Sequence, residues 1–357
     1  MTTAPDATDL AALGGWRELL GRLTSGGELT GPEAAAAMGE ILAGRATDAQ
    51  IAAFIVALRM KGESAVEVSG MVDAMLAAAA PITLPDGPDP IDIVGTGGAP
   101  SRRSHALNVS TMASLVAAGA GARVVKHGNR RASSTSGSAD LLEALGVVLE
   151  LDGPGVARCV AESGVGFCFA RTFHPAMRHA GPVRAELGVP TVFNYLGPLS
   201  NPAGVQRQVI GVSDRRVAPI VVGVLVERRA PLAMVVTGHD GTDELTTTGP
   251  STVHEVRDGA VTTRTVDPTE LGLQLATADA VAGGEPEQNA AIARRVLAGE
   301  AGPHADIVAL NAAAGLVVAG RADELGDGVE QARVAISSGA AAAALDRLVS
   351  ASRSAAG

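Results

Sequence analysis

Apolar positions recur at helical spacing through the N-terminal part of the chain. The first stripe spans residues 16–23, and further stripes follow within residues 35–42, 51–58 and 66–76. A residue that can cap a helix stands before each of the last three stripes, namely Thr30, Thr47 and Ser64. The pattern therefore predicts four short helices joined by small loops, in a compact helical unit.

Residues 81–90 are rich in proline and carry no apolar period, which predicts a linker or hinge. Beyond them, short apolar runs alternate with helical stripes. Strands are predicted at residues 91–94, 124–125, 165–169, 209–212 and 232–236. Helices are predicted at residues 108–120, 139–145 and 216–228. This βαβ rhythm is typical of an α/β domain whose central sheet is mostly parallel and flanked by helices.

The C-terminal part begins with an expected antiparallel hairpin near the sheet edge, formed by residues 253–256 and 261–266 across Asp258-Gly259. Helices are again predicted at residues 286–298, 305–318 and 340–349. The segment 174–195 has a helical pattern interrupted at Pro182 and Pro190. We expect this segment to fold back onto the N-terminal helices.

Composition narrows the class of protein. Of the 357 residues, 46% are hydrophobic but only 2% aromatic, and 44 are glycine, so the core must pack small aliphatic side chains closely. The net charge of −10, without a basic run, argues against a nucleic-acid partner. Cys159 and Cys168 are the only cysteines, which predicts neither a disulfide framework nor a zinc site. The chain shows no signal core and no run of about 18 apolar residues, so we expect no membrane span and a cytoplasmic location.

A glycine-rich turn follows the first predicted strand. In Gly95-Thr96-Gly97-Gly98 the glycines let backbone N–H groups approach a phosphate, although ordinary tight turns share this pattern. The next helix opens with Asn108-Val109-Ser110-Thr111, and helix N-termini attract anions, although Ser110 can also be a plain cap. The turn is neither GxGxxG nor a P-loop, which argues against dinucleotides and ATP-type phosphoryl transfer.

The densest polar stretch is Lys126-His127-Gly128-Asn129-Arg130, which leads into the hydroxyl-rich residues 133–138. Lys126 leaves the carboxyl end of a predicted strand, where open α/β sheets bind ligands. Asn129 can both donate and accept hydrogen bonds, and Ser133 and Ser134 can hold phosphate oxygens. The stretch therefore predicts that a phosphate and an organic acceptor bind side by side.

Two further clusters supply charge. Asp243 and Glu244 follow the strand at 232–236, and adjacent carboxylates there suit Mg²⁺ shared with substrate phosphates, although a solvated acidic turn has the same composition. His174, Arg178 and Arg184 lie along one segment, and an arginine can grip a carboxylate with two hydrogen bonds. Together the clusters predict a phosphate-bearing substrate, a divalent metal and a second, carboxylate-bearing substrate.

With these motifs in order, together with His174-Pro175-Ala176-Met177 and Leu196-Gly197-Pro198, the chain closely resembles the anthranilate phosphoribosyltransferase family over about residues 15–350. The resemblance implies a homodimer with the fold of the pyrimidine nucleoside phosphorylases. It implies a small helical domain of residues 13–80 and 174–196, and a large α/β domain of residues 81–173 and 197–352. The implied reaction joins anthranilate to 5-phosphoribosyl 1-pyrophosphate (PRPP) and releases pyrophosphate, in tryptophan biosynthesis.

The resemblance also implies roles for individual residues. PRPP is expected to contact Gly95, Gly97, Gly98, Asn108, Ser110, Thr111, Lys126, Ser133 and Ser134. Anthranilate is expected to contact Gly95, Asn129, His174, Met177 and Arg184. Ser110, Asp243 and Glu244 are expected to place Mg²⁺. Lys126, Asn129 and Arg184 are expected to carry catalysis.

The chain departs from the family pattern in two places. An acidic residue and a glycine usually follow the glycine turn, whereas this chain has Ala99-Pro100 and a longer loop that carries Arg102 and Arg103. We expect one of these arginines to reach the diphosphate. Arg171 also stands where the family more often has proline.

Three alternatives share parts of this pattern. A pyrimidine nucleoside phosphorylase has the same fold but attacks with phosphate, and the asparagine within the KHGNR stretch argues against it. A non-enzymatic nucleic-acid-binding relative requires a basic surface and a degraded metal site, contrary to the net charge of −10 and the intact Asp243-Glu244 pair. A substituted anthranilate as acceptor stays open, because a few pocket side chains decide acceptor choice.

Overall fold

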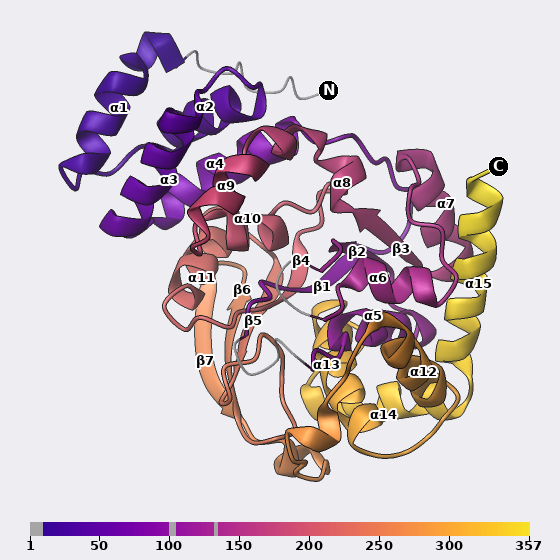
Figure 1. Ribbon diagram of the computed structural model, residues 1–357. Helices are drawn as coiled ribbons and strands as arrows, with labels where there is room; N and C mark the ends of the chain where they lie inside the picture. Colours follow the sequence, from indigo (N-terminus) through magenta and orange to yellow (C-terminus); the bar gives the residue numbers. More distant parts are fainter. Residues whose placement is uncertain (1–9, 100–104, 132–134) are drawn as a thin grey trace.

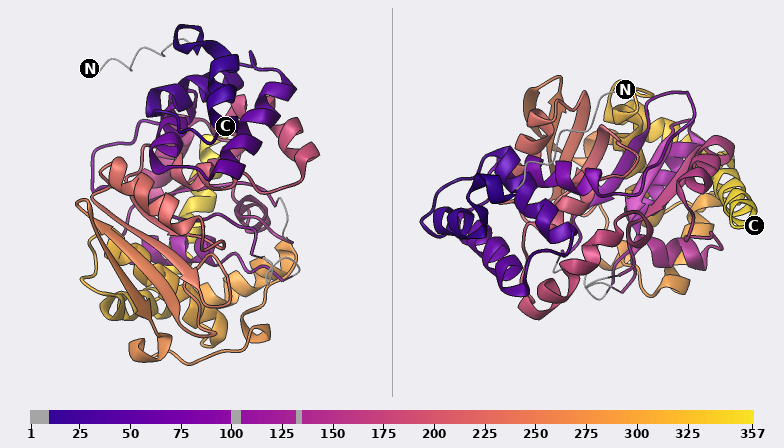
Figure 2. Two further views of the ribbon diagram at one scale, coloured as in Figure 1. Left: turned by 90° about the vertical axis from the view of Figure 1, so that its left-hand side faces the viewer. Right: turned by 90° about the horizontal axis from the view of Figure 1, so that it is seen from above.

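A computed structural model describes residues 10–99, 105–131 and 135–357 of the chain. The chain forms a small lobe of helices beside a larger α/β body (Figures 1 and 2). The N-terminal helices of the small lobe are α1 (Gly15–Thr24), α2 (Gly31–Leu42), α3 (Asp48–Lys61) and α4 (Ala65–Ala77). The four helices expected from the apolar stripes are confirmed.

The helix starts follow from local sequence. Thr30, Thr47 and Ser64 each accept a hydrogen bond from the backbone N–H three residues on, and Glu33, Gln50 and Glu67 complete the capping boxes. Glu67 also accepts from the backbone N–H of Leu29 at 2.9 Å and from Lys61 Nζ at 2.9 Å, so its buried charge is satisfied.

The α/β body is built on a seven-stranded sheet, within the described residues, in the order β3-β2-β1-β4-β5-β6-β7. The strands are β1 (Ile91–Gly95), β2 (Val124–Gly128), β3 (Val165–Phe169), β4 (Arg207–Gly211), β5 (Leu232–Gly238), β6 (Ser251–Arg257) and β7 (Ala260–Val266). The first five in spatial order run parallel, and β6 and β7 form the expected antiparallel hairpin at the edge. The prediction of a mostly parallel sheet flanked by helices, beside a helical unit, is confirmed.

Alternate residues of the strands enter separate cores on the two faces of the sheet. Ile91 and Ile93 pack into the core that includes α5 (Val109–Gly119) and α13 (Pro303–Val318), whereas Val94 packs into the core shared with α4 and α11 (Ala218–Glu227). The remaining helices of the first face are α6 (Ser138–Ala144), α7 (Gly153–Ser163), α12 (Pro286–Leu297), α14 (Leu325–Ser337) and α15 (Ala340–Ala355). Figure 1 shows α15 running beside α7 at the right-hand edge.

The helices α7 and α14 were not anticipated from the pattern. The first begins Gly-Pro-Gly and the second contains two glycines in its first turn, and glycine is a poor helix former. Tertiary packing overrides that preference, since Val156 and Cys159 of α7 and Val329 and Ala332 of α14 are buried. Within the described parts of the chain, no single helix is long and apolar enough to cross a membrane. Among the described helices, only the bent pair of α14 and α15, taken together, has a length and composition compatible with a span.

The segment between β3 and β4 contains short helices: α8 (Ala170–Phe173), η3 (Pro175–His179), α9 (Gly181–Leu187) and α10 (Phe193–Leu199). Pro182 lies in the first turn of α9, where proline starts a helix at no cost in hydrogen bonds. Val183, Phe193 and Tyr195 join the core of the N-terminal helices, so the segment packs back on that lobe. The linker before β1 is tied to the same segment, because Ala80 N donates to Phe173 O at 2.8 Å.

Candidate functional site

The candidate site lies at the carboxyl ends of the parallel strands. The chain passes from β1 through β2 to β3 on one side and returns to β4 on the other, so β1 and β4 flank the point where the strand order reverses. Ligands of open α/β sheets bind at such a point. Two of the pockets formed by described residues meet here, one of about 580 Å³ and one of about 330 Å³. We call the larger the apolar pocket and the smaller the polar pocket.

The two pockets share a wall. Val94, Gly95, His127, Gly128 and Asn129 line both of them. These residues lie at the carboxyl ends of β1 and β2, so the sheet edge itself separates the two spaces. A ligand in one pocket therefore lies against a ligand in the other across the ends of two neighbouring strands.

The glycine turn after β1 is braced by the acidic turn after β5. Gly97 N donates to Asp243 Oδ2 at 2.7 Å. A side chain at Gly95 would collide with the Asp243 carboxylate, and one at Gly211 would collide with its backbone carbonyl. Glycine is required at both positions so that the acidic turn can lie across the ends of β1 and β4.

Lys126 lines the polar pocket and is 2% exposed. Its Nζ donates to Ile93 O at 2.5 Å and to Ser110 Oγ at 3.1 Å. Burial lowers the pKa of Lys126 to about 8, although Asp92 and Asp243 favour its charged form. The lysine is thus a fixed cation at neutral pH, tied to the N-terminus of α5.

Asp92 is a buried partner of this cation that sequence reasoning missed. It accepts from Asn201 Nδ2 at 2.9 Å and from the backbone N–H of His127 at 3.3 Å. Burial raises the pKa of Asp92 to about 6, against the opposing attraction of Lys126. The available signal was the lone carboxylate inside the apolar run Ile91-Asp92-Ile93-Val94, where a charge requires a partner.

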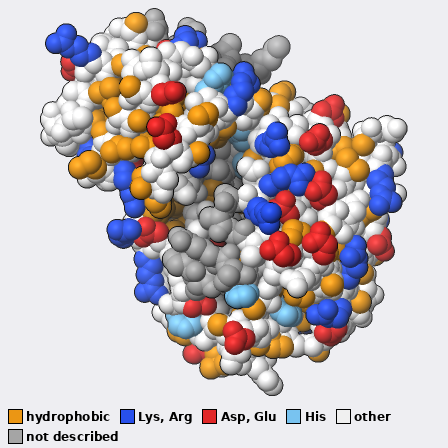
Figure 3. All heavy atoms as spheres, viewed as in Figure 1, with side chains coloured by type: hydrophobic (Ala, Val, Ile, Leu, Met, Phe, Trp, Pro, Cys, Tyr) orange, Lys and Arg blue, Asp and Glu red, His pale blue; other side chains and the backbone are white. Residues whose placement is uncertain are grey.

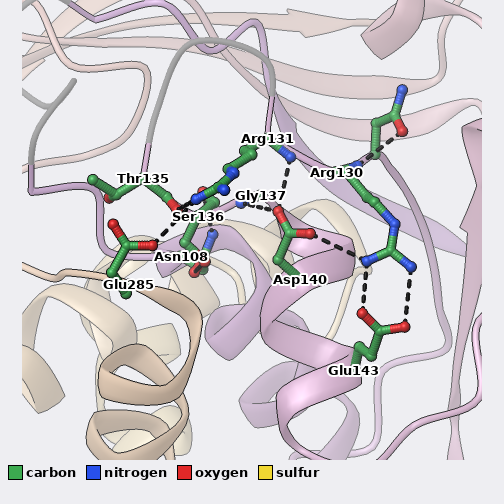
Figure 4. Close-up of polar contacts among 10 residues, drawn as sticks. Asn108, Arg130, Arg131, Thr135, Ser136, Gly137, Asp140, Glu143 and Glu285 are labelled. Atoms are coloured by element: carbon green, nitrogen blue, oxygen red, sulfur yellow. Dashed lines mark hydrogen bonds and ion pairs between the residues drawn. The ribbon is translucent and has the colours of Figure 1, made fainter.

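The helix N-terminus and the loop after β2 are joined by a buried amide. Asn108 Nδ2 donates to Ser136 O at 3.1 Å, and Ser136 Oγ donates to Asn108 Oδ1 at 2.8 Å (Figure 4). Asn108 and Ser110 line the polar pocket. Thr111 lies behind them, 1% exposed, with its hydroxyl buried and unpartnered. Ser133, Ser134, Arg102 and Arg103 lie outside the described residues.

Arg130 holds the outer side of the same loop. Its guanidinium bonds Glu143 at 2.6 and 3.0 Å and Asp140 at 3.3 Å, as Figure 4 shows. Its backbone N–H donates to Asn129 Oδ1 at 2.8 Å. Asn129 is thereby oriented by the backbone on the wall between the two pockets.

The apolar pocket combines hydrophobic walls with cations. Its lining includes Met75 from α4 and Leu196 and Pro198 from α10. Arg171, Arg178 and Arg184 also line it, whereas no acidic residue does so among the described residues. Arg184 stacks on the Phe193 ring at 5.0 Å, and burial lowers its pKa. Met177 and His174 complete the predicted set on this side.

Two neutral imidazoles line the apolar pocket, His127 as part of the shared wall and His174 beside it. The His127 and His174 rings are 5.1 Å apart, and burial is the main cause that lowers the pKa of each, to about 3 for His127. His127 Nδ1 bonds Gly197 O at 3.0 Å, so it is the donor, and the buried Nε2 is left as an unpartnered acceptor. His174 Nε2 is held by Ser200 O at 2.9 Å.

Asp243 and Glu244 line the polar pocket together with Ser110. Among the described residues, no group of three or more His, Cys, Asp or Glu side chains forms a metal cage. Two adjacent carboxylates and a hydroxyl beside a phosphate pocket instead fit Mg²⁺, which one or two carboxylates hold jointly with substrate phosphates. The arrangement can thus bind a phosphorylated, metal-bound ligand beside an apolar carboxylate.

Comparisons with known proteins agree with this geometry. Residues 17–79 match the helical bundle domain of the glycosyl transferase family, and residues 87–342 match its a/b domain. The chain is 54% identical over 338 residues to an anthranilate phosphoribosyltransferase of Rhodococcus jostii, covering 93% of this chain and 92% of the relative.

Solved structures are similar over nearly the whole chain. The anthranilate phosphoribosyltransferase of Thermus thermophilus has a TM-score of 0.88 and 46% identity, covering 94% of this chain and 99% of that one. The enzyme of Saccharomyces cerevisiae in complex with PRPP and Mg has a TM-score of 0.85 and 28% identity, covering 95% and 98%. The yeast enzyme in complex with 4-fluoroanthranilate has a TM-score of 0.84, covering 95% and 99% at 27% identity.

Proposed function

The chain belongs to the anthranilate phosphoribosyltransferase family, and from this premise we propose how its two pockets divide the reaction. The enzyme transfers the phosphoribosyl group of PRPP to the amine of anthranilate in tryptophan biosynthesis. A bond forms between the amine nitrogen and C1 of ribose, and the bond from C1 to pyrophosphate breaks. The products are N-(5-phosphoribosyl)anthranilate and pyrophosphate, and the amine loses a proton.

The shared wall is the observation that carries the assignment. Reaction requires that an aromatic amine meet C1 of a phosphorylated sugar, with the two ligands held in contact. The polar pocket suits PRPP and the apolar pocket suits anthranilate, and the residues Gly95 and 127–129 line both. C1 of ribose would then lie beside this wall.

On the PRPP side, the hard event is the departure of pyrophosphate. Lys126, the N–H group of Gly98, and the N-terminus of α5 at Asn108 and Ser110 supply positive potential for it. Because Lys126 is already fixed by Ile93 O and Ser110 Oγ, little reorganisation is needed as charge develops. The contacts expected from Thr111, Ser133 and Ser134 remain part of the proposal.

We assign the Mg²⁺ ligands to Asp243, Glu244 and Ser110. When bound, the ion would neutralise charge on the diphosphate and lower the cost of its release. The Asp243 carboxylate also orders the glycine turn through Gly97 N. The same residue would thus position both the metal and the backbone donors.

On the anthranilate side, Arg184 is the proposed carboxylate partner. Among the described residues it forms no ion pair, and its stacking on Phe193 fixes the plane of the guanidinium. Asn129, oriented by Arg130 N, would face the amine, while His174 and Met177 line the approach. An aromatic amine is neutral at pH 7 and carries its own lone pair, so attack needs orientation more than a strong base.

The division into domains and a homodimeric state belong to the same proposal. Residues 13–80 and 174–196 would form the small domain, and residues 81–173 and 197–352 the large one. Figure 3 shows hydrophobic side chains gathered over the small lobe, where Met60 of α3 is 84% exposed and Trp16 and Val56 are only partly buried. Such a face suits contact with a second copy.

An assay with anthranilate, PRPP and Mg²⁺ tests the function directly, by following the loss of anthranilate fluorescence. We expect turnover that requires all three components. A parallel assay with thymidine and phosphate should show no product. Phosphorolysis of thymidine without anthranilate turnover would replace the proposal with a nucleoside phosphorylase.

A further inference from the structure

The turn that precedes α12 contacts the two loops that line the polar pocket, the loop before α5 and the loop after β2. Gly283 N donates to His105 O at 2.9 Å. A side chain at Gly283 would collide with the carbonyl oxygen of Ala106 and with Asn289 Oδ1, so glycine is required for this approach. The turn therefore lies directly against the backbone that leads into Asn108.

Asn289, in the first turns of α12, is fully buried and uses its whole amide at this junction. Its Nδ2 donates to Ala106 O at 2.8 Å and to Asn108 Oδ1 at 2.9 Å, and more weakly to Gly284 O at 3.2 Å. Its Oδ1 accepts from Gly284 N at 2.8 Å. One side chain thus links α12 to the loop before α5.

Asn108 carries the link to the second loop. Although it stands at the N-cap of α5, it makes no side-chain capping bond. Its amide instead exchanges two hydrogen bonds with Ser136, and Figure 4 shows the two side chains next to each other. Asn289, Asn108 and Ser136 therefore form a continuous buried network across both walls of the polar pocket.

An ion pair on the outside joins the same elements but cannot replace this network. Arg131 Nη1 lies 3.2 Å from Glu285 Oε2, as Figure 4 shows. Both side chains are more than half exposed, at 55% and 57%. Exposed pairs of this kind contribute little to stability, whereas a buried acceptor that loses its donor is costly.

We propose that Asn289 is a positioning residue for PRPP: it fixes Asn108, and through Asn108 the loops at 105–108 and 135–137, without touching substrate itself. The inference rests on the proposed placement of PRPP in the polar pocket. Loss of the Asn289 amide leaves Asn108 Oδ1 and Ala106 O each without one buried donor. The loops then gain freedom in the free enzyme, and PRPP must order them on binding.

The test is PRPP binding in the presence of Mg²⁺, measured by isothermal titration calorimetry without anthranilate. Asn289→Ala should weaken binding about tenfold, a size typical of one lost buried hydrogen-bond partner. In steady-state assays KM for PRPP should rise while KM for anthranilate stays within about twofold. Asn289→Asp has a side chain of equal size but lacks the N–H donors, so it should weaken PRPP binding as Asn289→Ala does. It replaces the alanine variant in the test if that variant folds poorly.

Ser352→Ala is the matched control. Ser352 is also fully buried on a C-terminal helix, where it accepts from Val148 N and donates to Val349 O at 3.0 Å each, away from both pockets. It should lower thermal stability without weakening PRPP binding. An equal loss of affinity in this control would overturn the positioning role.

A double-mutant cycle identifies the route. If Asn289 acts through Asn108, then Asn108→Ala combined with Asn289→Ala should weaken PRPP binding no more than Asn108→Ala alone. Additive losses, or unchanged binding in Asn289→Ala, overturn the inference and leave the proposed function intact. Unchanged binding in Asn108→Ala as well would overturn the placement of PRPP in this pocket.

Discussion

The two pockets meet at one wall but are built in different ways. The polar pocket is made from short turns at the carboxyl ends of β1, β2 and β5, so each of its motifs is local in sequence. The apolar pocket is made from side chains of α4, α8, η3, α9 and α10, which converge only because the segment 170–199 packs back on the N-terminal lobe. The polar pocket is therefore determined by local sequence at the strand ends, and the apolar pocket by the tertiary packing of helices.

Because the two pockets are built differently, they suit ligands of different chemistry. The polar pocket presents one buried cation, backbone N–H groups and two carboxylates, which suit a charged ligand that shares a metal. The apolar pocket presents three guanidinium groups on hydrophobic walls without an acidic residue among its described lining. A substitution far from the shared wall should therefore change the binding of only one substrate, PRPP or anthranilate. A substitution in the shared wall should change the binding of both.

The largest effect is expected at Lys126. Lys126→Met should lower kcat by about 10²–10³-fold, since the fixed cation for pyrophosphate is lost. It should also destabilise the fold, because Asp92 is left buried without its cation. Adding Asp92→Asn should recover the free energy of unfolding, measured in urea, without recovering turnover. Recovered turnover would mean that Lys126 serves the fold alone.

The next effect concerns the metal ligands. Asp243→Asn with Glu244→Gln keeps the size of both side chains but removes their charge, and should lower kcat by about 10²-fold. The Mg²⁺ concentration for half-maximal activity should rise in a titration at fixed PRPP. Full activity at limiting Mg²⁺ would exclude these residues as ligands.

On the apolar side, Arg184→Ala should raise KM for anthranilate about 10–100-fold, the cost of a charge-assisted carboxylate contact. KM for PRPP should change by less than about threefold. Arg158→Ala is a suitable control, since that arginine is exposed and pairs with Glu162 far from both pockets. A parallel rise in both KM values would contradict the division of the pockets.

The pH dependence should separate the pockets as well. The pKa of Lys126 is lowered to about 8, so the free enzyme loses this cation as the pH rises through that value. We expect kcat/KM for PRPP to fall above pH 8. Between about pH 8 and 10.5, the unfolded chain keeps the Lys126 proton and the folded chain has lost it. The contribution of Lys126 to the free energy of unfolding therefore rises with pH over this range. A flat kcat/KM profile from pH 7 to about 9.5 would contradict the shift.

The smallest effect is expected at Arg171, which departs from the family pattern and lines the apolar pocket with an exposed side chain. Arg171→Ala should lower kcat/KM for anthranilate by no more than about threefold, and only at low ionic strength, as expected for steering of an anion. An effect that persists at high salt would instead indicate direct contact.

Much of the fold followed from local patterns. Helix caps at Thr30, Thr47 and Ser64, the apolar runs of β1 to β5, and the Asp258-Gly259 turn of the β6–β7 hairpin were readable because each depends on residues a few positions apart. The helices α7 and α14 escaped because glycines weaken their local preference, and only burial against the core stabilises them.

The residues of the site likewise fall into those predictable from local sequence and those that depend on tertiary packing. The sequence by itself determined the polar motifs, since Gly95 ends β1, Lys126 lies near the carboxyl end of β2 and Asp243 follows β5, and parallel strands end at one edge. Only the tertiary structure decided that the buried Asp92 carboxylate lies close enough to favour the charged form of Lys126, that Asn289 reaches Asn108, and that Arg184 stacks on Phe193. These contacts join residues that are not neighbours in the chain, and their partners are chosen by burial, since a buried polar group without a complement is costly.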